Sequence, residues 1–195
     1  MPLPLCVRIN ADDTASRDAL LVDGWRDIET LVTYVGRVAD MTATGIDTVD
    51  VTYVLNRAAE VDAVAELAGR IFTFDRLHRD TRVTKTDADE AKREWVRKAF
   101  GNPQCHIFTA RVAGVLLGFL IVKLQGEVLL IDLIGVDLAA QGQGIGQSLI
   151  VGAISALRGW VDAVQVGTQD VNTDAKAFYE GIGFHRTKSQ TTFHK

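Results

Sequence analysis

Glycines occupy three alternate positions, Gly142, Gly144 and Gly146, shortly after an apolar run over residues 128–136. Because glycine has no Cβ atom, consecutive backbone N–H groups in such a turn can approach an anionic group closely. The apolar spacing that follows predicts an amphipathic helix, whose N-terminal end favours negative charge. The segment therefore predicts a strand, a phosphate-binding turn and a helix in succession.

Two different structures use glycines in a similar way. Tight packing of a turn needs the same residues, and a dinucleotide-binding βαβ unit begins with a similar glycine motif. The dinucleotide motif needs an acidic residue at the end of the next strand, about 20 residues further on. Here the next predicted strand, over residues 163–166, is followed by Gly167, Thr168 and Gln169. This ending disfavours dinucleotide binding and leaves tight packing as the alternative to a phosphate site.

A second pattern occupies the last third of the chain. It consists of Thr168, Gln169, Asn172, Ala175, Phe178, Tyr179, Glu180, Gly183 and Phe184. Together with the glycine turn, and in this order, it resembles the GNAT superfamily of acyl-CoA-dependent N-acetyltransferases. The resemblance implies an α/β (α+β) fold in which helices flank a mixed central sheet. It also implies that acetyl-CoA is the cosubstrate.

The resemblance implies roles for individual residues. Coenzyme A would contact Ile134, Val136, Gln141, Gly142, Gln143, Gly144, Ile145, Gly146, Gln147, Asn172 and Tyr179. Within this set the glycine turn would hold the pyrophosphate, and the strand ending at Val136 would bind the pantetheine arm through its backbone. The chain departs from the family pattern at Leu138, where members often have proline, and this affects the rigidity of the loop.

Tyr179 and Asn172 are the catalytic residues that the resemblance implies. The Tyr179 phenol would donate a proton to the leaving thiolate during direct transfer, and Asn172 would hydrogen-bond the pantetheine arm. Each residue has a structural alternative. Tyr179 could be a core residue beside Phe178, and Asn172 could cap the helix that follows it.

Further residues narrow the resemblance to the dTDP-fucosamine acetyltransferase family. They are Val166, Gly167, Thr192, Phe193 and His194 toward the end of the chain and Ala68, Gly69, Phe72, Asp75, Arg76, His78, Asp80 and Trp95 before its middle, so the likeness covers residues 54–195. Members acetylate the 4-amino group of a nucleotide-linked 4-amino-4,6-dideoxyhexose. The loop with Arg76 and His78 would then contact the sugar nucleotide, and a solvated polar turn is the alternative.

The acceptor amine has to lose a proton, and a group with a pKa near neutrality would take it. The candidates are His78, Asp75 and Asp132, with water as a fourth. Asp132 stands in an otherwise apolar strand, where an unpaired carboxylate is costly. It therefore marks either a functional group or a structural hydrogen bond.

Two other classes of function remain open. A GNAT enzyme could act on a protein N-terminus or on another small-molecule amine such as an aminoglycoside. A non-catalytic acyl-CoA-binding module is the other class, and such a module would be expected to lose the acid. Because Tyr179 is present, we expect an enzyme whose partner is a small-molecule amine.

Composition excludes several classes. The 195 residues are 47% hydrophobic, enough for one substantial core, and carry a net charge of −4 without a basic stripe for nucleic acid. Apolar runs such as residues 115–122 are too short to span a bilayer, and the first residues lack a signal-peptide pattern, which predicts a cytoplasmic protein. Cys6 and Cys105 are too few for a disulfide framework or a metal site, so we expect no metal and place both in the core.

Apolar spacing also predicts the order of the elements. Helices are expected around residues 61–71 and 91–99, followed by strands over 105–111, 115–124 and 128–136 that form an antiparallel meander. A helix over 143–157, a strand over 163–166, a short helix over 175–180 and a last strand follow. This order is the one found in the acetyltransferase superfamily.

The first 50 residues echo the end of the chain. Both stretches read as a strand, a helix, a Gly-aromatic pair (Gly24-Trp25 and Gly183-Phe184) and a strand. The echo predicts a partial GNAT-like extension over residues 1–50 before an acetyltransferase domain over residues 51–195, with chance similarity as the alternative. Because the extension has no glycine turn, we expect it to bind no coenzyme A and to shape the substrate pocket. Its strands would pair with the main sheet or with a partner chain in a homodimer.

Overall fold

The computed structural model describes residues 3–41, 49–55 and 57–195. The strands are β1 (Cys6–Asn10), β2 (Arg26–Arg37), β3 (Asp50–Tyr53), β4 (Cys105–Val112), β5 (Val115–Gln125), β6 (Val128–Val136), β7 (Ala163–Gln169) and β8 (His185–His194). The helices are α1 (Thr14–Val22), α2 (Arg57–Ile71), α3 (Arg76–Arg79), α4 (Lys85–Gly101), α5 (Ile145–Ala156) and α6 (Thr173–Gly181). Two 3-10 turns, η1 (Val38–Asp40) and η2 (Leu138–Ala140), complete the described elements.

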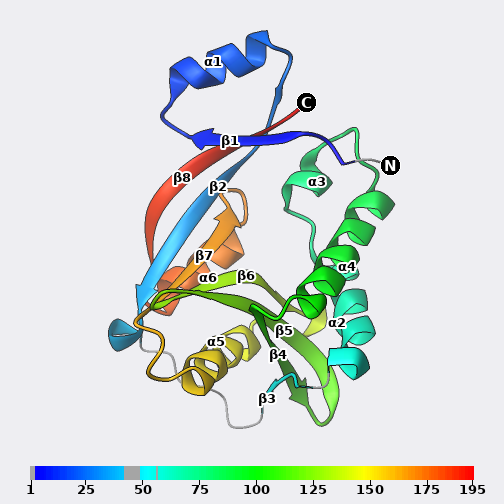
Figure 1. The fold of residues 1–195 in the computed structure, drawn as a ribbon, viewed down its shortest axis with the longest axis vertical. Coiled ribbons are helices and arrows are strands. Elements are labelled where there is room, and N and C mark those ends of the chain that lie inside the picture. The colour runs from blue at the N-terminus through cyan, green and yellow to red at the C-terminus, as the bar shows by residue number, and fades with distance from the viewer. Residues whose placement is uncertain (1–2, 42–48, 56) are drawn as a thin grey trace.

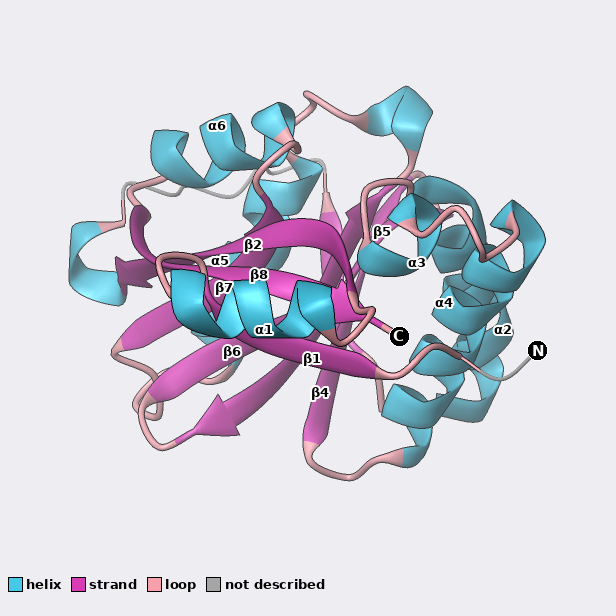
Figure 2. Cartoon of the chain, turned by 90° about the horizontal axis from the view of Figure 1, so that it is seen from above, coloured by secondary structure: helices cyan, strands magenta, loops and turns pink. Residues whose placement is uncertain are grey.

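The described strands form one sheet of eight strands in the spatial order β1-β8-β2-β7-β6-β5-β4-β3. Neighbouring strands are antiparallel except β6 and β7, which are parallel. Figure 1 shows α2 and α4 on one face of the sheet and α5 and α6 on the other, while Figure 2 shows α1 beside β1. A mixed sheet with helices on both faces is the fold class predicted from the sequence.

The predicted meander is confirmed by the antiparallel pairing of β4, β5 and β6. The helices α2, α4 and α6 are longer than their apolar spacing indicates, whereas α5 is slightly shorter than predicted, and polar side chains cap α4 and α6. The Thr84 hydroxyl accepts a hydrogen bond from the Asp87 N–H at 3.1 Å, so α4 begins at Lys85 instead of near Ala91. A cap of this kind contributes about 1 kcal/mol. The short elements β3 and α3 have no signal in the sequence pattern.

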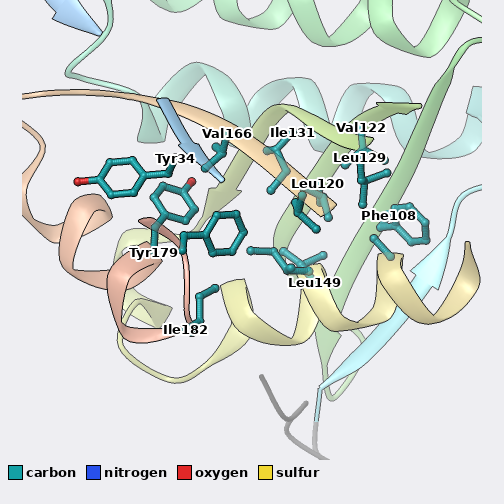
Figure 3. Close-up of a cluster of buried hydrophobic side chains, with 14 of the residues drawn as sticks. Tyr34, Phe108, Leu120, Val122, Leu129, Ile131, Leu149, Val166, Tyr179 and Ile182 are labelled. Atoms are coloured by element: carbon teal, nitrogen blue, oxygen red, sulfur yellow. The ribbon is translucent and has the colours of Figure 1, made fainter. Parts of the chain in front are cut away.

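Two apolar clusters hold the helices on the sheet. One joins α5 and α6 to the sheet, and Figure 3 shows Leu149 of α5 facing Leu120 of β5 at its centre. The other joins α2 and α4 to the opposite face and includes Val64, Val96 and Ile121. Full burial of a side chain such as Leu149, which is 0% exposed, contributes about 1.5–3 kcal/mol.

The two cysteines differ in their solvent exposure. Cys105 in β4 is buried, as predicted, but Cys6 is exposed. The reason is the position of β1, which is the last strand of the sheet and pairs only with β8 among the described strands. The prediction of a core cysteine is therefore wrong for Cys6.

The first segment of the chain is built into the main sheet. β2 lies between β7 and β8 and pairs with both, which is one of the two arrangements expected for it. The helices α1 and α6 correspond in detail, since the side chains of Asp13 and Asn172 cap them in the same way. Each helix is followed by a glycine with positive φ, Gly24 at +80° and Gly183 at +94°.

Candidate active site

The two parallel strands of the sheet diverge. The pairing of β6 with β7 ends at Ile131 and Val166, although β6 continues to Val136 and β7 to Gln169. Asp132 has no counterpart in the register of β6 with β5, which makes it the extra residue of a β-bulge. Because a bulge bends and twists its strand, β6 turns away from β7 at this residue. The backbone groups at the facing edges of the two strands are thereby left for a ligand.

A cavity of about 1400 Å³ lies at this divergence. It is larger than most small-molecule sites, which measure about 300–1,000 Å³. Its walls include the following residues predicted from the sequence: Asp75, Arg76, Asp132, Ile134, Val136, Gln141, Gly142, Gly144, Ile145, Gly146, Gln147, Asn172 and Tyr179. Gln143 and His78 lie outside the lining. The fold thus brings most of the predicted residues to one cavity.

The glycine turn forms part of the cavity wall. Gly142 and Gly144 have φ values of +74° and +75°, which side chains other than hydrogen rarely tolerate. The Ser148 N–H donates to the Gly144 carbonyl at 2.9 Å, so the N–H groups of the first helical turn before Ser148 have no partner inside α5. A Cβ atom at Gly142 would meet nothing within 4 Å, and this space can hold an anionic group.

The other residues of the turn have packing roles as well. Gly146 lies inside α5, where a Cβ atom would come 3.2 Å from the ring of Phe178, so glycine lets α5 pack closely on α6. Gln141 and Gln143 donate side-chain hydrogen bonds of 3.3 and 3.4 Å to backbone carbonyls that precede them. These bonds hold the loop between β6 and α5. Tight packing and a phosphate site are therefore compatible in this turn.

Tyr179 lies on the inner face of α6 and is 4% exposed. Its ring packs beside Phe178, Phe184 and Tyr34, with centroid distances of 5.1, 5.5 and 6.0 Å. Figure 3 shows Tyr179 beside Tyr34. Burial raises the pKa of the phenol above its ordinary value, so Tyr179 is protonated at neutral pH. Tyr179 is thus a core residue that also lines the cavity, and its role as an acid stays a prediction.

Asn172 occupies the N-cap position of α6. Its side-chain oxygen accepts a hydrogen bond from the Ala175 N–H at 3.2 Å, which is the predicted structural alternative. The same residue lines the cavity where β7 has diverged from β6. Capping uses the oxygen of the amide, so the nitrogen can still donate to a ligand.

Asp75 lines the cavity at the start of α3. It caps α3 through the Leu77 N–H at 3.0 Å, accepts a hydrogen bond from His78 at 2.7 Å and lies 3.4 Å from the Lys92 ammonium. Burial acts to raise the pKa of the Asp75 carboxyl, but His78 and Lys92 outweigh it and lower the pKa to about 2. Asp75 is therefore ionised at neutral pH and is a poor proton acceptor.

Lys92 of α4 is a cation of the cavity wall that the sequence did not reveal. Its ammonium lies 4.9 Å from the ring centre of Phe72 and 4.6 Å from that of Trp95. Burial lowers the pKa of Lys92, whereas the charge of Asp75 acts to raise it. The aromatic rings and Asp75 together compensate for the lost hydration of the ammonium.

His78 is held between two carboxylates. Its Nδ1 lies 2.7 Å from Asp75 and its Nε2 lies 3.0 Å from Asp89. The hydrogen bond to Asp75 raises the pKa of His78, burial opposes this shift, and Asp89 adds to it. Because both ring nitrogens are engaged and the residue lies outside the lining, His78 orients Asp75 and has no nitrogen left for a substrate proton.

Arg76 reaches the cavity from α3 and is fixed by a buried histidine. Its guanidinium donates to Nε2 of His194 at 3.1 Å, and Nδ1 of His194 donates to Asp80 at 2.9 Å. Burial lowers the pKa of His194, although the hydrogen bond to Asp80 opposes the shift. A neutral ring protonated on Nδ1 fits this arrangement and holds Arg76 in one position.

Asp132, the bulge residue, is paired through its Oδ2. It accepts hydrogen bonds from the Trp95 indole at 3.1 Å and from the Lys123 ammonium at 3.2 Å. Asp132 therefore makes structural hydrogen bonds, which was the alternative to a functional role predicted for it. Asp132 also lines the cavity.

Two charged residues of the first segment also line the cavity, Arg8 of β1 and Glu29 of β2. Glu29 is 5% exposed, and the Arg8 guanidinium lies 3.9 Å from its carboxylate. Sequence reasoning missed both, because no local motif marks them. They reach the cavity through the long-range pairing that inserts β2 between β7 and β8.

Comparisons with known proteins identify a family. The model of the acetyltransferase (GNAT) family matches residues 62–184. The chain is 28% identical over 153 residues to the N-alpha-acetyltransferase RimI of Mycobacterium tuberculosis, a match that covers 76% of this chain and 87% of that protein. It is 26% identical over 136 residues to the spore coat polysaccharide biosynthesis protein SpsD of Bacillus subtilis, which covers 69% of this chain but only 47% of that protein.

The fold also has solved counterparts. A functionally unknown conserved protein from Staphylococcus epidermidis superposes with a TM-score of 0.73 at 15% identity, over 97% of this chain and 72% of that one. At this identity the likeness concerns the fold alone. Among the described residues, no helix combines the length and apolar character needed to cross a bilayer.

Proposed function

This chain belongs to the acetyltransferase (GNAT) family, and we propose that it transfers an acetyl group from acetyl-CoA to the amino group of a nucleotide-linked 4-amino-4,6-dideoxyhexose. One observation carries the proposal. The cavity is lined both by the glycine turn and by the cations Arg8, Arg76 and Lys92, which come from other elements of the fold. The glycine turn suits a diphosphate from the coenzyme, and the cations suit one from the acceptor.

The residues around the glycine turn fit coenzyme A. The open space beside Gly142 and the N–H groups at the start of α5 suit its pyrophosphate. The diverging edges of β6 and β7 offer backbone groups to the amides of its pantetheine arm. Bound acetyl-CoA supplies an activated acyl thioester, and every other contribution comes from residues of the chain.

We assign Tyr179 as the group that donates a proton to the sulfur atom of the leaving coenzyme A. A thiol has a pKa of about 8.5 and a phenol about 10, so complete proton transfer from phenol to thiolate costs about 2 kcal/mol. Burial increases this cost by raising the pKa of Tyr179. The phenol is therefore suited to donating its proton as the carbon–sulfur bond breaks, and Asn172 is suited to orienting the pantetheine arm.

The cations Arg8, Arg76 and Lys92 in the cavity wall support an acceptor that carries phosphate. A guanidinium can form two parallel charge-assisted hydrogen bonds to a phosphate group. Arg76 is already held by His194, so little side-chain freedom is lost when it binds a ligand. The similarity to SpsD, whose name refers to polysaccharide biosynthesis, is a second support for a sugar acceptor.

A protein N-terminus is the second candidate acceptor, and the similarity to RimI supports it. The carboxylates of Glu29 and Asp75 would suit an N-terminal ammonium. However, Asp75 is already paired with Lys92 and His78. The three cations would have no counterpart on an uncharged peptide backbone, so we favour the acceptor with a diphosphate.

The test is a panel of acceptors, with release of coenzyme A and product mass as readouts. We expect a dTDP-4-amino-4,6-dideoxyhexose to exceed the free amino sugar in kcat/KM by at least about 100-fold, because each charge-assisted contact contributes about 1.5–3 kcal/mol. Preferred acetylation of peptides or of an aminoglycoside would reject the proposed substrate. Tight binding of acetyl-CoA without transfer to any amine would indicate a non-catalytic acyl-CoA-binding module.

We also infer that residues 1–50 derive from half of an acetyltransferase-like unit and that residues 51–195 form the acetyltransferase domain. The support is the correspondence of α1 with α6, which includes the backbone hydrogen bonds at their C-terminal ends. The Trp25 N–H bonds the Leu20 carbonyl, as the Phe184 N–H bonds the Tyr179 carbonyl. Leu20 stands where Tyr179 stands in the second unit, so the first unit carries no acid.

A further inference from the structure

Glu29 is a carboxylate with an unused oxygen in the cavity wall. Its side chain is 2% exposed. Among the described residues, its Oε2 is the buried side-chain polar atom that has no hydrogen-bond partner. Buried polar atoms are almost always satisfied in folded proteins, so an unpaired oxygen in a cavity wall points to a ligand that pairs with it.

The other oxygen of Glu29 is weakly engaged. The Thr192 hydroxyl lies 3.5 Å from Oε1, and the Arg8 guanidinium lies 3.9 Å from it. Arg8 in turn donates to the Thr192 hydroxyl at 3.0 Å, so it is directed toward Thr192 more than toward Glu29. Glu29 is therefore held in place through Oε1, while Oε2 has no hydrogen-bond partner among the described residues.

Glu29 sits beside the diverging end of β7. The Asp170 N–H donates to the Thr30 carbonyl at 2.8 Å, and Leu31 is opposite Gln169 in the register. Leu31 and Gln169 line the same cavity as Tyr179. The strand from the first segment thus brings a carboxylate to the cavity that the coenzyme and the acceptor would share.

We propose that Glu29 receives the acceptor amine and takes its proton during acetyl transfer. An N–H bond of the amine breaks and an O–H bond forms at Oε2, while the nitrogen pair forms the bond to the acyl carbon. The carbon–sulfur bond breaks and the proton of Tyr179 goes to sulfur. Tyr179 regains a proton from solvent as Glu29 releases one, so the charges balance. This assignment rests on the proposed acetyltransferase function and specifies its acceptor site.

The electrostatic surroundings agree with this assignment. Burial raises the pKa of Glu29, the charge of Arg8 opposes the shift, and the charge of Asp75 adds to it. Gln169 and Arg76 also act to lower the pKa, and Lys92 is a further cation of the cavity wall. A carboxylate with a raised pKa is a better proton acceptor near neutral pH than an ordinary one.

Competing carboxylates are already occupied. Asp75 bonds His78, Lys92 and the start of α3, and its pKa is lowered to about 2. Asp132 bonds Trp95 and Lys123. Of the three carboxylates discussed for the cavity wall, Glu29 alone has a buried oxygen without a hydrogen-bond partner in the described part of the chain.

The test is Glu29→Gln, which keeps the size of the side chain and removes its charge. We expect kcat to fall by about 100-fold or more, the usual effect of losing a general base. The acidic limb of the pH profile of kcat should disappear, while the affinity for acetyl-CoA stays the same. The matched control is Glu60→Gln, since Glu60 pairs with Arg111 at 2.8 Å and lies outside the cavity lining. It should leave kcat and its pH profile unchanged.

A second readout needs no turnover. Calorimetry should show that wild type binds a 4-amino sugar nucleotide more tightly than its 4-hydroxy analogue, and that Glu29→Gln loses this preference. Loss of thermal stability with an unchanged acidic limb and an unchanged amine preference would make Glu29 structural and overturn the proposal. If a peptide amine proves to be the acceptor, the same variants are compared on that amine. The substrate proposal then fails while the role of Glu29 is still decided.

Discussion

Leu31 of β2 lies opposite Gln190 of β8, and this pair is the centre of a two-fold relationship between the first and last segments of the chain. A shift of 159 residues takes Leu31 to Gln190, and it takes the pair Asp27–Phe193 to the pair Tyr34–Arg186. The same shift takes the pairing of β1 with β8 onto that of β7 with β2. The first segment therefore completes the sheet in the way that a second copy of the last segment would.

This arrangement predicts unequal effects of two truncations. A variant that begins at residue 41 lacks β2, which supplies the fully buried Val32 and Tyr34 and pairs with two strands. Loss of each such side chain costs about 1.5–3 kcal/mol, so we expect no cooperative unfolding transition by circular dichroism. A variant that begins at residue 24 lacks β1 and α1, and α1 has no buried residue, so it should unfold cooperatively at a lower Tm. If both variants had the same Tm as wild type, the proposed stabilising role of β2 would be contradicted.

The glycine turn predicts a specific loss of coenzyme binding. Gly142→Val places a side chain in the open space beside the turn and forces valine into a positive φ, so we expect acetyl-CoA to bind at least roughly tenfold more weakly by calorimetry. Gly159→Val is the control for backbone strain. Gly159 has a φ of +88° with nothing near its missing Cβ atom, and it lies outside the cavity lining. Similar affinity for acetyl-CoA in both variants would show that the glycine turn does not bind the coenzyme.

Tyr179→Phe should separate binding from turnover. We expect the affinity for acetyl-CoA to persist and kcat to fall by about two to three orders of magnitude, the range for losing a general acid. The control is Tyr34→Phe, because Tyr34 is the neighbouring buried phenol, with its hydroxyl bonded to Glu180 at 2.8 Å. This control should lower the Tm modestly and change kcat by less than about tenfold. A Tyr179→Phe variant with wild-type kcat would show that the proton comes from another group.

The sequence predicted the parts of the fold that local pattern controls. Residues 128–136 alternate between buried and half-buried positions in β6, and the apolar stretch in the sequence already indicates this strand. Gly142 and Gly144 adopt the positive φ that only glycine accepts readily, so the turn that they form could be predicted from the sequence. Elements whose residues specify their own conformation are therefore predictable.

The sequence did not predict contacts that depend on distant pairing. Glu29 reaches the cavity only because β2 pairs with β7 and β8, and an irregularity in the register between Asp27 and Glu29 changes which side chains face inward. The local sequence around His78 gave no indication that Asp89 of α4 would be its hydrogen-bond partner. Pairing across the chain decides both positions, and a single sequence does not encode it in a local motif.

His78 predicts a pH dependence of stability. Its pKa in the folded protein is raised above that of the unfolded chain, so its contribution is fully present below about pH 6.5 and is lost as the pH rises through the folded value. The Tm deficit of His78→Gln should therefore be greatest near pH 6 and shrink toward alkaline pH. The pKa of Asp75 is lowered to about 2, so Asp75 stays ionised across this range and adds no slope. Exposed His185 provides the control, and a deficit that grows with pH would contradict the assignment.

Arg76 predicts how the acceptor is recognised. Arg76→Ala should raise the KM for a dTDP-4-amino sugar by about 10- to 100-fold, since a charge-assisted contact contributes about 1.5–3 kcal/mol, while the KM for acetyl-CoA changes little. Arg79→Ala is the matched control, because Arg79 belongs to the same short helix but lies outside the cavity lining and bonds the Ile28 carbonyl. The KM for a free amino sugar should respond weakly to both changes, because it carries no diphosphate. An equal rise in KM for the nucleotide-linked and the free sugar would mean that Arg76 does not bind the diphosphate and acts through His194 on the shape of the cavity.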